Sequence, residues 1–311
     1  MTLPAQTIEQ PGAASPEYRA GGTDLQQRLR SGVSSGRLID LHRLPGLRGI
    51  SWDAGRAKIG ALTPIADIAR DAALSAAYPP LVQAAASLAT PQIRAQATLA
   101  GNLLQRNRCW YFRHPAVSCY KKGGATCPAR DGNHLFSSCF DLGPCVAPHP
   151  STLGMALVAY EEAQFEVAER GMRPIAALYG DGSDARRDHQ LKDGELVTAV
   201  LMPPPLPGEH GAYFRATSRA SAEWPLAEAL VRLALTGEKI SFARVTVGAV
   251  APIPLRRQEV EGALVGEPAT AGTLARAARH SAHGAQPLPM TQYKVQLVCA
   301  TVLEALQHAL H

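Results

Sequence analysis

Thr98-Leu99-Ala100-Gly101-Asn102 is a glycine-bearing turn, and a crowded set of cysteines begins seven residues after it. Five of the six cysteines of the chain belong to that set: Cys109, Cys119, Cys127, Cys139 and Cys145. The turn offers a hydroxyl, a glycine and a carboxamide, in Thr98, Gly101 and Asn102, which suit phosphate or ribitol oxygens. Thiolates suit iron–sulfur centres and zinc. The pairing of the two indicates an electron carrier.

A second turn, Ala20-Gly21-Gly22-Thr23-Asp24-Leu25, stands between an expected strand at 17–20 and an expected helix at 24–30. Glycines permit unusual backbone angles, and free amide groups at a helix start favour an anion. Each turn by itself is also typical of a plain strand–helix junction. Their joint position in one domain favours a nucleotide site.

The bulk composition is that of an ordinary globular protein of 311 residues and 33.0 kDa, with 46% hydrophobic and 18% charged residues. The net charge is +5, but the basic residues are scattered, which argues against nucleic-acid binding. No apolar run is long enough for a membrane span. The first fifteen residues show no export signal, so we expect a cytoplasmic protein, or a periplasmic one exported together with a signal-bearing partner.

The pattern along the chain predicts two domains, residues 1–205 and 206–311, separated near Pro203-Pro204-Pro205. Alternating strands and helices in the first domain indicate an α/β or α+β fold. Residues 105–148 interrupt it as a long loop without periodicity, which the cysteines would hold together. Expected strands are 37–41, 56–62, 165–167, 196–201, 212–217 and 242–250, and expected helices are 63–69, 153–160, 225–235 and 291–310.

The crowded cysteines admit an iron–sulfur cluster, a zinc site or disulfides. Their gaps of ten, eight and eighteen residues, from Cys109 through Cys119 and Cys127 to Cys145, are not the close pairs of most zinc sites. The residues alone leave cluster and zinc about equally supported. Cys299 lies in an apolar helical pattern and is expected to be a small buried side chain.

At this point the sequence resembles a known family, the FAD-binding medium subunits of the molybdenum hydroxylases, which include xanthine dehydrogenase and carbon monoxide dehydrogenase. The resemblance covers residues 17–311 and rests on an ordered set of short motifs rather than on any single one. The motifs are the two turns above, Leu38-Ile39-Asp40, Ile59-Gly60-Ala61-Leu62-Thr63, Pro91-Gln92-Ile93-Arg94, Gly194-Glu195-Leu196, Phe214-Arg215, Arg219-Ala220-Ser221 and Val247-Gly248-Ala249-Val250-Ala251.

The cysteine loop narrows the resemblance. Arg108-Cys109-Trp110-Tyr111-Phe112 and the cysteines that follow are similar to an insertion in periplasmic aldehyde oxidoreductases of the PaoABC type and in 4-hydroxybenzoyl-CoA reductase, where it holds a 4Fe-4S cluster. This implies Cys109, Cys119, Cys127 and Cys145 as ligands and leaves Cys139 as a surplus thiol.

The resemblance also implies the flavin contacts and the fold. The FAD pyrophosphate would contact the backbone of the first turn, which comprises Ala20, Gly21, Gly22, Thr23, Asp24 and Leu25. The linker region of FAD would contact Thr98, Gly101 and Asn102, and the isoalloxazine ring would lie near Arg215. Leu196 is the last of the implied cofactor-binding residues. The implied fold is α+β: a PCMH-type FAD-binding domain of two subdomains with the cysteine insertion, then a C-terminal domain of a small antiparallel sheet and helices.

Three departures from the family pattern stand out. The segment before the first turn is short, Thr152 stands where an aspartate is usual, and Ala222 where a tyrosine is usual.

The implied function is an FAD- and 4Fe-4S-containing electron-transfer subunit of a heterotrimeric molybdenum hydroxylase, most like an aldehyde oxidoreductase. Its partners would be a molybdopterin-binding large subunit, a 2Fe-2S small subunit and an external electron acceptor. No nucleophile–base set stands out, so no catalytic residue is expected in this chain. The alternatives are a xanthine or aromatic acyl-CoA oxidoreductase subunit, a flavoenzyme acting alone on a small alcohol, and a zinc-stapled scaffold without a redox role.

Overall fold

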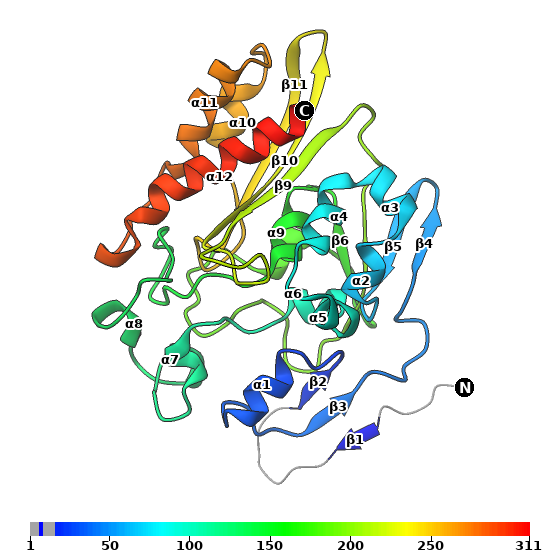
Figure 1. Cartoon of the computed structure of the whole chain (residues 1–311). Helices are drawn as coiled ribbons and strands as arrows, with labels where there is room; N and C mark the ends of the chain where they lie inside the picture. Colours follow the sequence, from blue (N-terminus) through cyan, green and yellow to red (C-terminus); the bar gives the residue numbers. More distant parts are fainter. Residues whose placement is uncertain (1–5, 9–15) are drawn as a thin grey trace.

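Three β-sheets organise the chain, for which a computed structural model describes residues 6–8 and 16–311 (Figure 1). The expectation about an export signal concerns residues 1–15, nearly all of which lie outside the described part. The first sheet has the order β1 (Gln6–Ile8), β3 (Leu38–Asp40), β2 (Glu17–Arg19). The second has the order β4 (Ile50–Asp53), β5 (Arg56–Gly60), β8 (Val197–Leu201), β6 (Gln164–Val167), β7 (Gly171–Pro174). The third has the order β12 (Leu255–Arg256), β11 (Lys239–Gly248), β10 (Ala227–Thr236), β9 (His210–Ala216).

The first two sheets form two subdomains of the N-terminal half. The small sheet, in which β2 runs parallel to β3, carries the helix α1 (Leu25–Arg30). The five-stranded sheet is antiparallel throughout and packs with short helices. These are α2 (Ile65–Ile68), α3 (Ala72–Ala77), α4 (Pro79–Ala86), α5 (Pro91–Gln96), α6 (Leu99–Leu103), α9 (Thr152–Val158) and the short 3-10 turn η2 (Ile175–Leu178). Ser151 caps α9, the helix expected at 153–160, because its hydroxyl accepts the Gly154 N–H at 2.8 Å.

The C-terminal half packs its helices on one face of the antiparallel third sheet (Figure 1). The helices are α10 (Gln258–Leu264), α11 (Ala271–Arg279) and α12 (Tyr293–Leu310), with the short turns η3 (His280–Ala282) and η4 (Pro289–Thr291). α12 buries Val298, Val302 and Leu306 against β9 and β10. The terminal helix predicted from apolar spacing is therefore present, and the α+β fold is confirmed.

The prediction of a helix at 225–235 is wrong, because these residues form most of β10. β10 is a central strand whose register pairs Leu230 with Tyr213 of β9 and with Thr246 of β11. It is buried on both faces, by α12 on one side and by the N-terminal half on the other. A strand buried on both faces is apolar without alternation, and in a short run that pattern cannot be told from a buried helix.

The cysteine loop, residues 105–148, contains three short helical turns: α7 (Trp110–Arg113), η1 (Tyr120–Lys122) and α8 (Pro128–Asp131). It is attached to the C-terminal half, because the N–H groups of Cys139 and Phe140 both donate to the carbonyl of Val250. It also contacts the small subdomain, because Arg113 of the loop pairs with Asp24. No helix among the described residues has both the length and the apolar character needed to cross a membrane.

Candidate functional site

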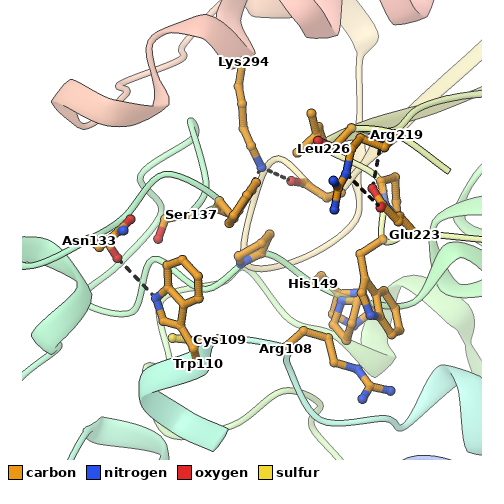
Figure 2. A pocket seen from close by; sticks show the side chains of 17 residues that line it. Arg108, Cys109, Trp110, Asn133, Ser137, His149, Arg219, Glu223, Leu226 and Lys294 are labelled. Carbon is orange, nitrogen blue, oxygen red and sulfur yellow. Dashed lines mark hydrogen bonds and ion pairs between the residues drawn. The ribbon is translucent and has the colours of Figure 1, made fainter.

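Two adjoining cavities lie where the two subdomains, the cysteine loop and the third sheet meet. The first, of about 280 Å³, is lined by both predicted turns through Thr23, Asp24, Gly101 and Asn102, and we call it the turn cavity. The second, of about 430 Å³, is lined by Trp110, Phe136 and Trp224 with several polar side chains, and we call it the aromatic cavity (Figure 2). The two cavities share the residues Arg108, Glu223, Trp224 and Pro225. Both have volumes close to those usual for small-molecule sites.

The first turn lies directly against the backbone that leads into the second turn, because Gly21 has no side chain. A Cβ on Gly21 would stand 1.8 Å from the carbonyl oxygen of Gln96, closer than any real contact. Gly22 adopts a φ of 73°, a left-handed conformation that favours glycine. The glycine pair read from the sequence is therefore required for the close approach of the two turns.

The polar groups of the second turn are partly used in building it. Thr98 accepts the Gly101 N–H on its hydroxyl oxygen at 3.2 Å, which caps α6. Asn102 accepts the Ser151 hydroxyl at 2.8 Å and the Leu153 N–H at 3.2 Å on its amide oxygen. The amide nitrogen of Asn102 is left as a hydrogen-bond donor in the wall of the turn cavity.

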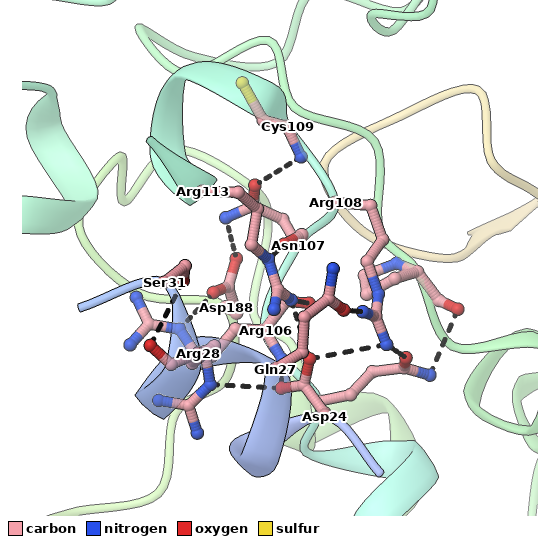
Figure 3. Close-up of polar contacts among 12 residues, drawn as sticks. Asp24, Gln27, Arg28, Ser31, Arg106, Asn107, Arg108, Cys109, Arg113 and Asp188 are labelled. Atoms are coloured by element: carbon pink, nitrogen blue, oxygen red, sulfur yellow. Dashed lines mark hydrogen bonds and ion pairs between the residues drawn. The ribbon is translucent and has the colours of Figure 1, made fainter. Parts of the chain in front are cut away.

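Asp24 connects the first turn to the cysteine loop (Figure 3). Its carboxylate accepts the Arg106 N–H at 3.1 Å and a guanidinium N–H of Arg113 at 2.7 Å, and Arg28 of α1 donates at 3.2 Å. Arg108 stands 3.3 Å away. Burial raises the pKa of Asp24, but the three neighbouring arginine side chains outweigh it and hold the pKa below its ordinary value.

The region around Asp24 carries more positive than negative charge. Arg106 and Lys121 of the loop share the buried carboxylate of Asp188, at 2.5 and 2.8 Å. The ion pairs form two groups, Arg28, Arg108 and Arg113 with Glu17 and Asp24, and Arg106 and Lys121 with Asp188, and each group has one more cation than carboxylates. The walls of the turn cavity also contain more cations than carboxylates, namely Arg94, Arg108 and Arg215 against Asp24 and Glu223. An anionic ligand would compensate this excess of positive charge.

Two arginines in the walls of the turn cavity have unsatisfied donors. The Nε atoms of Arg108 and Arg215 are buried and have no hydrogen-bond partner among the described residues. Arg215, on β9, donates its terminal nitrogens to the carbonyls of Ser87 and Glu223. Arg108 lies over the Trp224 ring, 4.3 Å from its centre. Both side chains are thus held in place, and each keeps an Nε–H group that can donate to a ligand.

Thr152 has a carboxylate neighbour in place of the aspartate that is usual at its position. Its hydroxyl donates to Glu228 of β10 at 2.8 Å, and Tyr213 donates to the same oxygen at 2.7 Å. Burial raises the pKa of Glu228, against the hydrogen bonds from Tyr213 and Thr152. Thr152 and Ala222, two of the three departures, both line the turn cavity.

The four cysteines implied as ligands line one small cavity, of about 20 Å³, which we call the cysteine cavity. Cys109 precedes α7, and the N–H groups of Tyr111 and Phe112 point at its sulfur. Cys127 precedes α8 and receives the N–H groups of Val146, Ala129 and Arg130. The backbone therefore directs hydrogen-bond donors at these sulfur atoms.

The thiols of this cavity differ in the direction in which their pKa values are shifted. A hydrogen bond from Cys145 lowers the pKa of Cys127, and the same bond, with burial, raises the pKa of Cys145. Burial raises the pKa of Cys109. All six cysteines are free thiols, so the structure has no disulfide. In the described part of the chain, no three His, Cys, Asp or Glu side chains converge on one point as a single-ion site requires.

The other cysteines and histidines are placed apart from the cysteine cavity. Cys139 is fully buried in the core of the C-terminal half, and Cys299 packs at the edge of that core. His134 accepts the Met290 N–H, and His149 lines the aromatic cavity. His114 follows α7 on the loop and is exposed.

The remaining predicted cofactor residues take supporting places. Leu25 is buried at the start of α1. Ala20 and Leu196 pack together with Leu41, Leu47 and Leu62 in a small apolar cluster. Leu25, Ala20 and Leu196 do not line the turn cavity.

Sequence reasoning missed the charged residues that bind the loop to the first turn. Arg106, Arg108 and Arg113 form a cationic run around Cys109, and Asp188 comes from the polar segment 180–193. The run itself was a usable signal, since arginines that flank an anion-binding turn are natural phosphate partners. Nothing in the sequence marks Asp188 as their partner.

Comparison with known proteins gives two consecutive family matches. Residues 6–205 match the FAD binding domain in molybdopterin dehydrogenase, and residues 212–309 match the CO dehydrogenase flavoprotein C-terminal domain.

Individual relatives agree with these matches. The chain is 34% identical over 232 residues, 72% of its length and 71% of the relative's, to the aldehyde oxidoreductase FAD-binding subunit PaoB of Escherichia coli K12. It is 29% identical to the alpha subunit of the 6-hydroxypseudooxynicotine dehydrogenase complex of Paenarthrobacter nicotinovorans, covering 94% of this chain and 86% of that one. A carbon monoxide dehydrogenase chain from Hydrogenophaga pseudoflava shares the fold, with a TM-score of 0.74 at 22% identity, covering 96% of this chain and 90% of that one.

Proposed function

Because this chain belongs to the family of FAD-binding subunits of the molybdopterin dehydrogenases, we propose that it is the electron-transfer subunit of a molybdenum hydroxylase and carries both FAD and a 4Fe-4S cluster. One observation carries the proposal. A turn cavity with an excess of positive charge and a cavity lined by four cysteines are joined by a single short segment that includes Arg108 and Cys109.

The turn cavity suits FAD in its charge and its donors. The pyrophosphate of FAD is anionic, and cations outnumber carboxylates in the walls of this cavity. Arg108 and Arg215 each supply a charged donor in the walls of the cavity, and the Asn102 amide supplies a neutral one. FAD bound there would supply two-electron redox chemistry. Thr23 and Asp24 place the backbone of the first turn in the same wall.

We assign the four cysteines of the cysteine cavity to a cluster rather than to zinc because their loop resembles an iron–sulfur insertion, and because their gaps of ten, eight and eighteen residues lack the close pairs of most zinc sites. In a 4Fe-4S cluster each of four thiolates binds one iron. Cys109, Cys119, Cys127 and Cys145 line one cavity, and backbone N–H groups face two of the sulfurs. Such hydrogen bonds are among the factors that set cluster potentials.

The assembly we propose is an aldehyde oxidoreductase. PaoB is 34% identical over 72% of this chain, the 6-hydroxypseudooxynicotine dehydrogenase subunit is 29% identical over 94%, and the similarity to xanthine dehydrogenase FAD-binding subunits covers only 27%. The substrate would be oxidised on a molybdopterin-binding large subunit, with a 2Fe-2S small subunit between it and this chain. Cell fractionation would decide between the cytoplasm and a periplasmic location reached by co-export.

Purification with the native companions tests the proposal. We expect a sample with flavin absorption bands and broad iron–sulfur absorption, about one FAD and four iron atoms per chain, and two co-purifying subunits, one of them containing molybdenum. A colourless sample with zinc would contradict the proposal and support the scaffold alternative. Full alcohol-oxidising activity of this chain without a molybdenum subunit would support the independent flavoenzyme.

A further inference from the structure

The aromatic cavity has a lining that the proposed cofactors do not explain. Trp110, Phe136 and Trp224 each leave nearly half of their surface exposed, and all three line this cavity. Trp110 and Phe136 meet edge to face, with ring centres 5.7 Å apart. Large aromatic rings gathered around an open cavity mark a binding site more often than a packing defect.

Two buried polar side chains in the wall of this cavity have hydrogen-bond donors to spare. His149 is 4% exposed, and its Nδ1 accepts the Ser151 N–H at 3.3 Å. The proton of the neutral ring must then be on Nε2, which has no partner within the described part of the chain. Burial lowers the pKa of His149 to about 3, so the ring is neutral at pH 7.

Lys294 provides the second donor. It is 1% exposed, and its ammonium group donates to the carbonyls of Ala249 at 2.9 Å and Phe136 at 3.3 Å. Three N–H bonds serve two acceptors, so one donor remains. Figure 2 shows Lys294 and His149 on different sides of the cavity, which Trp110, Phe136 and Trp224 also line. The one carboxylate of the lining, on Glu223, is occupied by Arg219.

From this arrangement we propose that the aromatic cavity binds a quinone: a planar ring that packs among Trp110, Phe136 and Trp224, with carbonyl oxygens that accept from His149 and Lys294. Aromatic walls suit a flat ring, and hydrogen-bond donors on two sides of the cavity suit two carbonyl groups on opposite sides of that ring.

This assignment rests on the proposed function in one respect, because it names the class of the external electron acceptor. A quinone gains two electrons and two protons and becomes a hydroquinone, and the same two electrons and two protons come from the reduced flavin, which returns to FAD. Cys109 lines both the cysteine cavity and the aromatic cavity, so a quinone held there would lie beside one of the proposed cluster ligands.

Calorimetric titration of the purified complex with duroquinone tests the assignment, because this fully substituted quinone cannot add to thiols. We expect one saturable site per chain. Durene, which has the same ring and methyl groups but no carbonyl oxygens, should bind at least about tenfold more weakly, since two hydrogen bonds are lost. Equal binding of duroquinone and durene would overturn the role of His149 and Lys294.

Substitutions test whether duroquinone binds in the aromatic cavity. Trp110→Leu is expected to weaken duroquinone binding about tenfold with flavin and iron content unchanged. Trp52→Leu is the matched control, because Trp52 is 40% exposed on β4 and lies outside both cavities, and it should leave binding unchanged. An equal effect of the two substitutions would overturn the assignment.

Comparison of FAD-loaded and FAD-free protein separates the quinone from the flavin ring as the occupant. Duroquinone that binds only after FAD is removed would mean that the cavity holds part of FAD, and the assignment would be wrong. Flavin and iron are measured in the same samples. A colourless protein that still binds duroquinone at the Trp110-dependent site would refute the proposed function and leave the quinone site standing.

Discussion

At the scale of the residue, Asp24 makes contacts that its sequence motif does not predict. In the sequence it is part of a glycine turn whose backbone would meet a phosphate. In the structure its carboxylate holds Arg28, Arg106 and Arg113, and so attaches the cysteine loop to the turn. A carboxylate this deeply buried is stable only because several donors compensate the cost of removing it from water.

Replacement of Asp24 should therefore cost stability. Asp24→Asn leaves the neighbouring arginines with less negative charge, and we expect a loss of about 2 to 3 kcal/mol in the free energy of unfolding. Asp67→Asn removes an exposed pair with Arg48 and should cost less than about 0.5 kcal/mol. Urea denaturation measures both. Similar losses in the two variants would show that the Asp24 contacts contribute little.

The cysteines give a second prediction at this scale. Cys119→Ser removes a thiol from the cysteine cavity and should lose most of the bound iron, whereas Cys139→Ser should keep it. The second change buries a hydroxyl in the core of the C-terminal half and should cost about 1 to 3 kcal/mol of stability. Iron analysis of the two purified proteins makes the comparison, and equal iron content would contradict the ligand assignment.

At the scale of the element, the cysteine loop is ordered by contacts at both of its ends. Its first part is held by Asp24 and by Asp188, which comes from the segment 180–193. Its last part is held by the Val250 carbonyl. With little regular structure of its own, the loop depends on these contacts for its shape.

Asp188→Asn should loosen the first part of the loop. Lys121 and Arg106 hold the pKa of Asp188 far below its ordinary value of 3.8, despite burial. The contribution of this carboxylate to stability is therefore complete above pH 3.8 and is lost as the pH falls below it. At pH 7 we expect hydrogen–deuterium exchange at 106–122 to rise about tenfold, which corresponds to a loss of about 1.4 kcal/mol.

The matched control lies in the same segment. Asp184 is exposed, pairs with Arg187 at 3.9 Å and accepts the Arg186 N–H at 2.8 Å, both within its own segment, so Asp184→Asn should leave exchange in the loop unchanged. If both variants exchange like the parent protein, then the buried ion pairs of Asp188 do not order the loop.

At the scale of the whole molecule, the two halves meet around Glu228. This carboxyl group on β10 binds Thr152 of α9 and lies against Gly248 of β11, where an added Cβ would come within 2.5 Å of it. The third sheet thereby provides one of the surfaces behind the turn cavity. The site is complete only when both halves are folded together.

Glu228→Gln tests that contact through its pH dependence. The raised pKa means that the folded protein holds the Glu228 proton more tightly than the unfolded chain does. Its stabilising contribution is therefore complete below its ordinary pKa of 4.5 and is lost as the pH rises through the higher value in the folded protein. The variant cannot ionise, so between pH 5 and pH 8 its melting temperature should fall about 2 to 4 °C less than that of the parent protein.

Thermal unfolding across this range gives the answer, with Glu238→Gln in the exposed turn after β10 as the control. The control should follow the parent protein. Parallel curves for all three proteins would mean that Glu228 does not ionise within this range.

The sequence by itself determined the local elements and the residue types of the site. Glycine pairs, capping residues and helical apolar spacing act over a few residues, so the two turns, the Ser151 cap and α12 follow from them. The four-cysteine set was also available, through its resemblance to an iron–sulfur insertion.

Only the tertiary structure decided what depends on residues far apart in the chain. β10 is a strand because β9 and β11 pair with it on both sides, although its apolar run alone also suits a helix. Asp188 meets Arg106, and His149 and Lys294 face one cavity, across separations of more than 80 residues. Burial, charge compensation and cavity shape arise from such distant contacts, and no local pattern contains them.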